Sequence, residues 1–293
     1  MSSQQETDRP GVDGEGSEPE SVPEPQQRRL ATKTARRERK ERAAEAAREE
    51  RAAEETVHLK VFRYDPEVEE KREPRFDHFH VPDEPGLTVL DGLIYARDQF
   101  DSSLTVRHSC RQAVCGSDAV FVNGRQRLAC KTQTSGLDEP IVVEPLPHQE
   151  VIKDLVVEME HFYDQMEAVE PYFQPASEPP GEMEEYRQTP ANREAIKEAT
   201  RCIWCGACTS SCNVVAGDET FLGPAAINAA YRFYADDREG AEEHRLDLLD
   251  DADGVFRCQT QFSCTTVCPK DIPLTKHIQT LKREAVKENL KFW

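Results

Sequence analysis

The sequence predicts an α+β protein with two folded domains, a small domain of strands and one helix followed by an all-helical domain. Three observations support this prediction. Its 293 residues suffice for about two domains. Apolar residues alternate in strand fashion in the first domain and follow helical spacing in the second. Ten cysteines fall into three groups that respect the same division. We expect the segments to be 1–55, 56–150 and 151–293.

Residues 1–55 precede the expected folded region. Residues 1–27 are rich in Glu, Pro, Ser and Gly, so we expect disorder. Residues 28–55 favour helix but have no apolar stripe, which predicts a solvated or transient helix. A basic arm that contacts anionic lipid or an acidic partner is the alternative. The N-terminus has no apolar core of a signal peptide, so we expect the chain in the cytoplasm.

The expected first domain begins with two strands that pair back on each other, at residues 56–64 and 75–81. Residues 88–100 have the apolar spacing of a helix. Short strands follow at residues 119–124, which end in an Asn-Gly turn signal, and at residues 141–146. The order of two strands, a helix and further strands predicts a small α+β domain.

The second domain reads as helices placed between cysteine groups. Residues 151–169 form an amphipathic pattern that predicts one continuous helix. A linker rich in Pro and Glu follows. Further helices are expected at residues 190–201, 223–237 and 274–290.

Charge and cysteine content narrow the function. The net charge of −19 argues against nucleic-acid binding, which needs a basic surface. The acidity fits a soluble, well-hydrated surface, and its spread along the chain favours adaptation to high salt. No apolar run approaches the roughly 20 residues of a membrane span. Ten cysteines in a cytoplasmic chain indicate metal or cluster ligands in preference to disulfides.

The first cysteine group contains Cys110, Cys115 and Cys130. Plant-type 2Fe-2S ferredoxins use C-x4-C-x2-C and a remote cysteine, and here Asp118 stands at the third ligand position. We therefore expect a 2Fe-2S cluster held by Cys110, Cys115, Asp118 and Cys130. Ser117 or a water molecule is the alternative fourth ligand. Zinc is disfavoured, because zinc sites use C-x2-C pairs, and no Cys-x-His pair of a Rieske site occurs.

The second group, "CIWCGACTSSC", has the full C-x2-C-x2-C-x3-C spacing of a cubane cluster. Two-residue spacers let three thiolates reach three corners of one cube. In two-cluster proteins, the fourth cysteine of such a run binds the other cluster. The fourth cysteine here, Cys212, is therefore expected to serve the third group.

The third group, "CQTQFSCTTVCP", departs from the cubane run because Gln261 occupies the second ligand position. A carboxamide supplies no thiolate, so the iron at that corner would be lost and a 3Fe-4S cluster would remain. Exchange of the fourth cysteines predicts the 4Fe-4S ligands Cys202, Cys205, Cys208 and Cys268. It predicts the 3Fe-4S ligands Cys212, Cys258 and Cys264.

The number of ligands that the three clusters need equals the number that the chain offers. The three clusters need eleven protein ligands, and the chain offers ten cysteines and Asp118. Three different clusters suggest a chain of redox centres that pass electrons in sequence, since cluster type, charge and hydrogen bonds set the reduction potential of each cluster. The sequence lacks the glycine motifs of Rossmann and P-loop sites, so FAD or NAD would belong to another subunit.

Over about residues 56–293, the chain resembles the iron–sulfur subunits of succinate dehydrogenase and quinol:fumarate reductase. The resemblance rests on "SCRQAVCGSDAVFVNG", "LAC", "VIKDLVVEMEHFY", "CIWCGACTSSC", "GPAAINAAYRF" and "CTTVCPKDIPLTKHI". It implies an N-terminal β-grasp 2Fe-2S domain beside the FAD of a flavoprotein subunit, and an all-α ferredoxin-like domain with the other two clusters. It also implies a quinone site shared with membrane-anchor subunits, on the cytoplasmic face of the membrane. Some members carry Asp at the position of Asp118.

The resemblance implies succinate oxidation, with fumarate reduction as the same reaction in reverse. A free soluble polyferredoxin and a structural zinc protein are the remaining alternatives. This chain departs from the family pattern where Trp commonly follows the cysteine matching Cys212, and at Gln259, where His is common. Quinone contacts therefore cannot be assigned from the resemblance. Lys270 and Lys276 read as surface charges, or as contacts to headgroups or an anchor subunit.

Overall fold

The computed structural model describes residues 40, 56–178, 181 and 185–291. The chain divides into two compact units, residues 1–54 and 55–293, and every element named below belongs to the second unit. The predictions for residues 1–55 concern positions outside the described residues, apart from Lys40.

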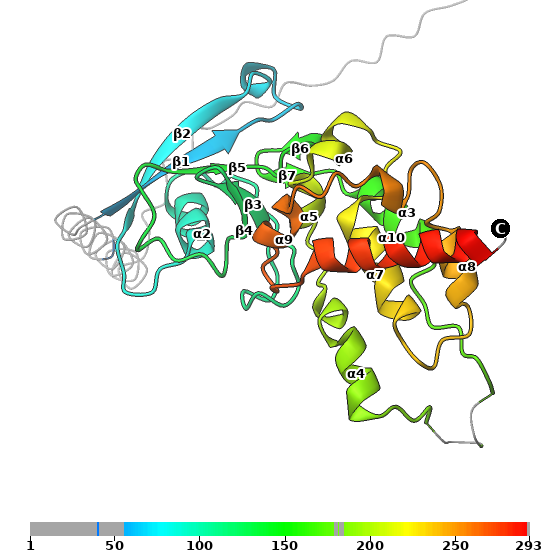
Figure 1. The fold of residues 1–293 in the computed structure, drawn as a ribbon. Helices are drawn as coiled ribbons and strands as arrows, with labels where there is room; N and C mark the ends of the chain where they lie inside the picture. Colours follow the sequence, from blue (N-terminus) through cyan, green and yellow to red (C-terminus); the bar gives the residue numbers. More distant parts are fainter. Residues whose placement is uncertain (1–39, 41–55, 179–180, 182–184, 292–293) are drawn as a thin grey trace, which may run out of the picture. The chain divides into compact units, whose positions relative to one another are not determined.

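A five-stranded mixed sheet organises the N-terminal half of this unit (Figure 1). Its order is β2-β1-β5-β3-β4, in which β1 is parallel to β5 and every other neighbouring pair is antiparallel. The strands are β1 (Thr56–Arg63), β2 (Arg75–Pro82), β3 (Ala119–Val122), β4 (Arg125–Leu128) and β5 (Ile141–Glu144). A 3-10 turn, η1 (Glu69–Lys71), lies between β1 and β2.

The strands form where the sequence predicts alternation. Strand β1 buries every second residue, and its last inward side chain is Arg63. Asn123 and Gly124 both have positive φ, 45° and 76°, which fits a two-residue hairpin turn. This turn joins β3 to β4, a strand that the sequence pattern did not predict.

Helix α2 (Val89–Gln99) agrees with the predicted helix and belongs to the same core as the sheet. Its start is fixed by a capping box between Thr88 and Asp91. Leu90 and Leu93 are fully buried in that core.

The predicted continuous helix over residues 151–169 is wrong in its first half. That half forms a two-stranded ribbon, β6 (Val151–Lys153) and β7 (Val156–Val157), and only α3 (Glu160–Ala168) is helical. The reversal occurs at Asp154, which has a φ of 47°. Its buried carboxylate accepts hydrogen bonds from Arg63 Nε and the Thr105 amide, 3.0 and 2.9 Å away. Distant partners therefore override the local helical pattern.

The C-terminal half is helical, as predicted. Its Ala-rich helix α7 packs against α3, α5, α8 and α10. The elements after α3 are α4 (Pro190–Lys197), η2 (Ala199–Arg201), α5 (Ala207–Ser210), α6 (Asn213–Gly217), α7 (Gly223–Tyr234), α8 (Glu242–Asp247), η3 (Val255–Arg257), α9 (Ser263–Val267) and α10 (Leu274–Lys291).

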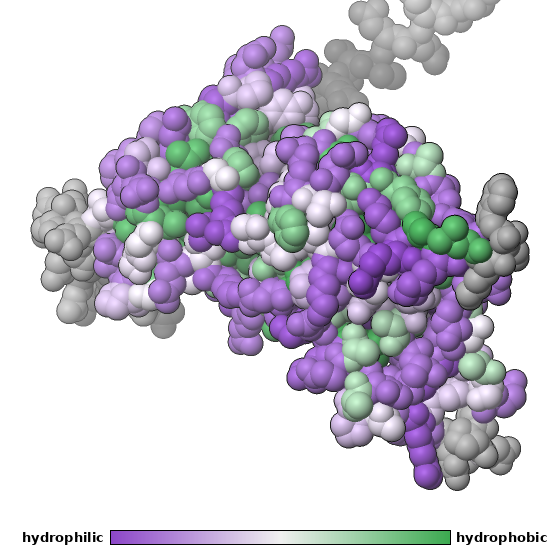
Figure 2. All heavy atoms as spheres, viewed as in Figure 1, coloured by the Kyte–Doolittle hydropathy of each residue, from purple (hydrophilic) through white to green (hydrophobic). Residues whose placement is uncertain are grey.

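Two apolar cores underlie these halves. Leu155 packs with the sheet and α2, whereas Phe162 packs with α7 and α10. The change of core therefore falls between these two residues, and the domain boundary near residue 150 stays a prediction. Figure 2 shows mainly hydrophilic side chains on the visible face, in keeping with the net charge of −19.

Candidate metal centres

Two members of the first cysteine group, Cys110 and Cys115, lie on a loop before β3 that turns its backbone amides towards sulfur. Arg111 and Ala113 both have positive φ, 56° and 55°, and this coils the chain tightly. Cys110 Sγ accepts hydrogen bonds from the amides of Gln112, Val114 and Cys115, at 3.4, 3.4 and 3.3 Å. These backbone bonds lower the pKa of Cys110 to about 7. The loop therefore stabilises a thiolate, the form that binds metal.

Asp118 lies inside the same group and is only 2% exposed. Its Oδ2 accepts a hydrogen bond from the Cys130 amide at 2.5 Å, while its Oδ1 is buried and has no hydrogen-bond partner. Burial, and then the adjacent Asp118, raises the pKa of Cys130 to about 12. A buried carboxylate oxygen without a donor fits a place on a metal atom. By contrast, Ser117 Oγ is 3.2 Å from Cys115 Sγ, so it already has a partner.

A single cavity brings together the four cysteines expected to hold the 4Fe-4S cluster. It is lined by Cys202, Cys205, Cys208 and Cys268. Positive φ angles at Trp204 and Gly206 let the chain turn between three of them. Burial raises the pKa of Cys205 to about 12 and the pKa of Cys208 well above its usual value. Such thiols lose their protons when a metal cation takes the protons' place.

A second cavity gathers the three cysteines expected to hold the 3Fe-4S cluster, Cys212, Cys258 and Cys264. Gln261 also lines this cavity. It occupies the position in the sequence at which a full cubane run has the cysteine that would complete a set of four thiolates. The amide of Thr260 donates to Cys258 Sγ at 3.4 Å. Burial raises the pKa of the Cys264 thiol.

Two short helices explain why the cysteines divide in this way. Helix α5 contains Cys208 and ends just before Cys212, while α9 contains Cys264 and ends just before Cys268. The two helices pack against each other. Each helix thus spans the distance between the two cavities, and neighbours in the sequence belong to different sets.

The donor sets suit clusters better than single ions. Within the residues that the structure describes, no three His, Cys, Asp or Glu side chains converge as ligands of one metal ion. A zinc ion needs its thiolates about 2.3 Å from one point. The seven cysteines of the helical half line two cavities instead. Thiols spread around a cavity suit a multi-atom cluster, which distributes its ligands over several irons.

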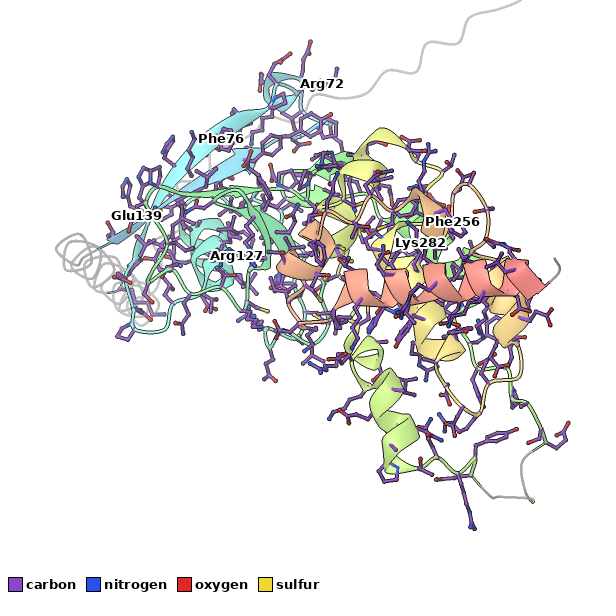
Figure 3. All side chains as sticks on the ribbon, in the orientation of Figure 1. Arg72, Phe76, Arg127, Glu139, Phe256 and Lys282 are labelled. Atoms are coloured by element: carbon purple, nitrogen blue, oxygen red, sulfur yellow. The ribbon has the colours of Figure 1, made fainter. Side chains whose placement is uncertain are left out.

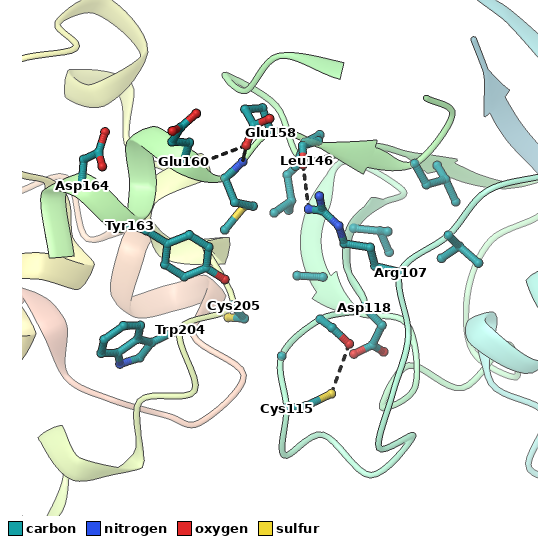
Figure 4. A pocket seen from close by; sticks show the side chains of 18 of the residues that line it. Arg107, Cys115, Asp118, Leu146, Glu158, Glu160, Tyr163, Asp164, Trp204 and Cys205 are labelled. Carbon is teal, nitrogen blue, oxygen red and sulfur yellow. Dashed lines mark hydrogen bonds between the residues drawn. The ribbon is translucent and has the colours of Figure 1, made fainter. Parts of the chain in front are cut away.

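The first two groups meet at a larger cavity of about 600 Å³ (Figure 4). Cys115 and Asp118 lie on one wall, and Cys205, Trp204 and Tyr163 lie on the other. Arg107 also lines this cavity, and its guanidinium donates a hydrogen bond to the carbonyl of Val157 at 2.7 Å. The two expected cluster sites are therefore neighbours.

Two family models match these two regions of the chain. Residues 58–164 match a 2Fe-2S iron-sulfur cluster binding domain, and residues 198–272 match a 4Fe-4S dicluster domain. The fumarate reductase iron-sulfur subunit of Mycobacterium tuberculosis is 41% identical over 236 residues, covering 80% of this chain and 95% of the relative. The chain belongs to the family of iron–sulfur subunits of succinate dehydrogenase and fumarate reductase.

Other members of the family agree. The mitochondrial succinate dehydrogenase iron-sulfur subunit 1 of Oryza sativa is 37% identical over 233 residues, which cover 79% of this chain and 83% of the relative. A chain of the Mycobacterium smegmatis Sdh1 complex in the apo form superposes with a TM-score of 0.72 at 27% identity, covering 80% of this chain and 98% of that one. The family predicted from the motifs is confirmed, and the chain is an iron–sulfur subunit that transfers electrons.

Contacts between the two halves of this iron–sulfur subunit were not predicted from its sequence. Lys270, read as a surface charge, is half-buried and donates to the Ala113 carbonyl at 3.0 Å. Lys131 donates to the Pro269 carbonyl at 2.9 Å. A lysine directly after a Cys-Pro pair was the available signal, but the sequence does not reveal a partner 157 positions away. No helix in the described part of the chain is long and apolar enough to cross a membrane.

Proposed function

We propose that this chain is the electron-transfer subunit of a succinate:quinone oxidoreductase. It would take electrons from FAD on a flavoprotein subunit and deliver them to quinone. The observation that carries this proposal is the division of seven cysteines between two adjacent cavities, four around one and three around the other. That division agrees with one 4Fe-4S and one 3Fe-4S cluster beside the 2Fe-2S group.

Each cluster has a proposed set of ligands. Cys110, Cys115, Asp118 and Cys130 would hold the 2Fe-2S cluster. Cys202, Cys205, Cys208 and Cys268 would hold the 4Fe-4S cluster. Cys212, Cys258 and Cys264 would hold the 3Fe-4S cluster. When bound, the clusters supply one-electron redox chemistry at potentials that the surrounding protein adjusts.

Contacts within the chain support a spatial order for the three proposed ligand sets, with the 4Fe-4S set between the other two. Gly116, next to Cys115, packs directly against Cys205, which places the first set beside the second. Helices α5 and α9 each bridge the second and third sets. This order supports entry at the 2Fe-2S group, which would face the flavoprotein, and exit at the 3Fe-4S group.

The exit side has features suited to an apolar partner. Phe256 and Phe262 flank the third set and are 39% and 56% exposed. Lys282 on α10 donates to the Cys258 carbonyl at 3.2 Å and lies over the Phe256 ring, beside which Figure 3 shows it. We propose that this face meets the membrane-anchor subunits and quinone, which would hold the chain on the cytoplasmic side of the membrane.

The same electron path serves a fumarate reductase running in the opposite direction. The Mycobacterium tuberculosis relative carries that name, so we keep fumarate reduction as the second candidate. Deletion of the gene separates the two. Loss of growth on succinate under aerobic respiration supports oxidation, whereas a defect only during anaerobic growth with fumarate supports reduction.

Purification from native membranes tests the complex itself. We expect the tagged full-length chain to copurify with a FAD-bearing chain and hydrophobic anchor chains, in a complex that reduces quinone with succinate. A matched Cys264→Ser complex should retain succinate oxidation by an artificial flavin-level acceptor but lose quinone reduction. Isolation as a soluble monomer without FAD would instead identify a free polyferredoxin, and zinc without acid-labile sulfide would identify a structural zinc protein.

A further inference from the structure

Lys270 links the loops of two proposed cluster sites. It lies two positions after Cys268 and lines the cavity of the four cysteines. Its ammonium group donates to the carbonyl of Ala113, 3.0 Å away, in the loop of the first cysteine group. The side chain is half-buried, so water screens this contact only in part.

The carbonyl that Lys270 contacts belongs to a peptide group with a second role. The same peptide carries the N–H of Val114, which donates to Cys110 Sγ at 3.4 Å. One peptide group therefore connects the ammonium of Lys270 to the sulfur of Cys110. The preceding peptide carries the Ala113 N–H, which donates to Cys130 Sγ at 3.3 Å.

A cation on a peptide oxygen strengthens the hydrogen bond that the same peptide donates. Hydrogen bonds in a chain polarise one another, and a charged member strengthens the effect. The N–H of Val114 thereby becomes a better donor to Cys110. A reduced cluster carries one more negative charge than an oxidised one, and hydrogen bonds to its sulfurs raise its potential.

The charge of Lys270 is held in place and is not neutralised locally. Within the part of the chain that the structure describes, Lys270 forms no ion pair with a carboxylate. Its loop is fixed by Lys131 Nζ, which donates to the Pro269 carbonyl at 2.9 Å. Arg201 donates to the carbonyl of Lys270 at 3.4 Å. The lysine therefore contributes a fixed positive charge between the two sites.

We propose that Lys270 is a positioning residue that raises the reduction potential of the 2Fe-2S cluster through the Ala113–Val114 peptide group. The proposal rests on the proposed function, since it requires Cys110 to be a cluster ligand. It assigns to one lysine of the helical half an effect on the cluster of the other half. The positive charge would therefore help the 2Fe-2S cluster to accept an electron. The neighbouring 4Fe-4S site would receive that electron next.

Redox titration of the purified complex, followed by EPR, tests this proposal. Lys270→Met removes the cation and the hydrogen bond, Lys270→Gln keeps a donor without charge, and Lys270→Arg keeps the charge. We expect a more negative 2Fe-2S potential in the Met and Gln variants and recovery of most of the shift in the Arg variant. Lys276→Met is the matched control, because its side chain is 71% exposed and its removal changes the net charge equally.

Three results would overturn the proposal. They are an unshifted 2Fe-2S potential in both neutral variants, a shift confined to the 4Fe-4S cluster, and an equal shift in Lys276→Met. If Lys270→Met does not assemble, comparison of the Gln and Arg variants gives the same decision. Failure of the proposed function looks different, because the wild-type complex would then lack a 2Fe-2S signal or would keep it after Cys110→Ser.

Discussion

Gly116 packs directly against Cys205. A Cβ atom added at Gly116 would lie 2.8 Å from the Cβ of Cys205 and 2.8 Å from the carbonyl oxygen of Ile203. Real side chains do not approach that closely, so only glycine permits this contact. The φ of Gly116 is also positive, at 74°. The contact brings the loop of the first cysteine group against that of the second.

Gly116→Ala should therefore separate the two loops. Overpacking costs roughly 1–3 kcal/mol, and left-handed backbone adds about 1–2 kcal/mol for a residue with a side chain. We expect a lower thermal midpoint and a loss of quinone reduction larger than the loss of flavin-level succinate oxidation. Gly124→Ala is the control, because Gly124 has a φ of 76° but no atom within 4 Å of an added Cβ. Equal effects of the two substitutions would show that only backbone strain is involved.

Asp118 and Ser117 can be distinguished by substitution. Because Asp118 Oδ1 is buried without a donor, we expect Asp118→Ala to lose the 2Fe-2S EPR signal, or most of it. Asp118→Cys should restore a cluster with four thiolates and a changed spectrum. Ser117→Ala should leave the signal in place. Loss of the signal in Ser117→Ala, with retention in Asp118→Ala, would assign the fourth ligand to the serine. Retention of the signal in both variants would assign it to a water molecule.

Gln261→Cys should add the missing thiolate to the third set. Gln261 lines the cavity with Cys212, Cys258 and Cys264, so a cysteine there completes a four-thiolate set. We expect the EPR signal of the oxidised 3Fe-4S cluster to disappear and a reduced 4Fe-4S signal to replace it. Gln261→Ser serves as a control of similar size. An unchanged three-iron signal in the cysteine variant would place position 261 away from the vacant corner.

His277 should make stability depend on pH. It is 1% exposed, its ring stacks on Tyr231, and its Nδ1 lies 2.8 Å from Asn228 Oδ1. Burial, aided by Lys276, lowers its pKa from 6.5 to about 4. Because the unfolded chain binds the proton more readily, the free energy of unfolding falls as the pH drops from 6.5 to about 4. The full loss is up to about 3 kcal/mol, at about 1.4 kcal/mol per pH unit.

Thermal midpoints of the wild-type and His277→Gln complexes, measured from about pH 7 to about pH 5, check this dependence. The difference between the two complexes should shrink as the pH falls, because only the wild type loses stability through this group. His161→Gln, at an exposed position, should follow the wild type. A difference that stays constant across the range would contradict the role of His277.

The sequence predicted the parts of the fold that local chemistry determines. Alternation predicted β1, and Asn123-Gly124 marked the hairpin turn. The prediction of a helix over residues 151–169 failed, because a stretch rich in valine suits a helix or a strand equally well. The choice is made by the buried carboxylate of Asp154 and its partner Arg63, which lies 91 positions earlier. Such a pairing exists only in the folded chain.

The candidate site shows the same division. Cysteine spacing was enough to predict which thiols gather around which cavity. The spacing predicts that the last cysteine of each run joins the other run, and the two short helices place Cys212 and Cys268 in that way. The ligand roles themselves stay predictions. The sequence around Gly116 does not reveal its contact with Cys205, and the sequence around Lys270 does not reveal Ala113 as its partner. Both depend on how the two halves pack.

Low-temperature EPR of the isolated complex, oxidised and then reduced, tests the three-cluster account most directly. The account predicts a 3Fe-4S signal in the oxidised sample, and 2Fe-2S and 4Fe-4S signals on reduction, with roughly nine irons and roughly ten acid-labile sulfides per chain. An oxidised sample without a 3Fe-4S signal, despite a full complement of iron, would contradict the role assigned to Gln261 and the division of the cysteines with it.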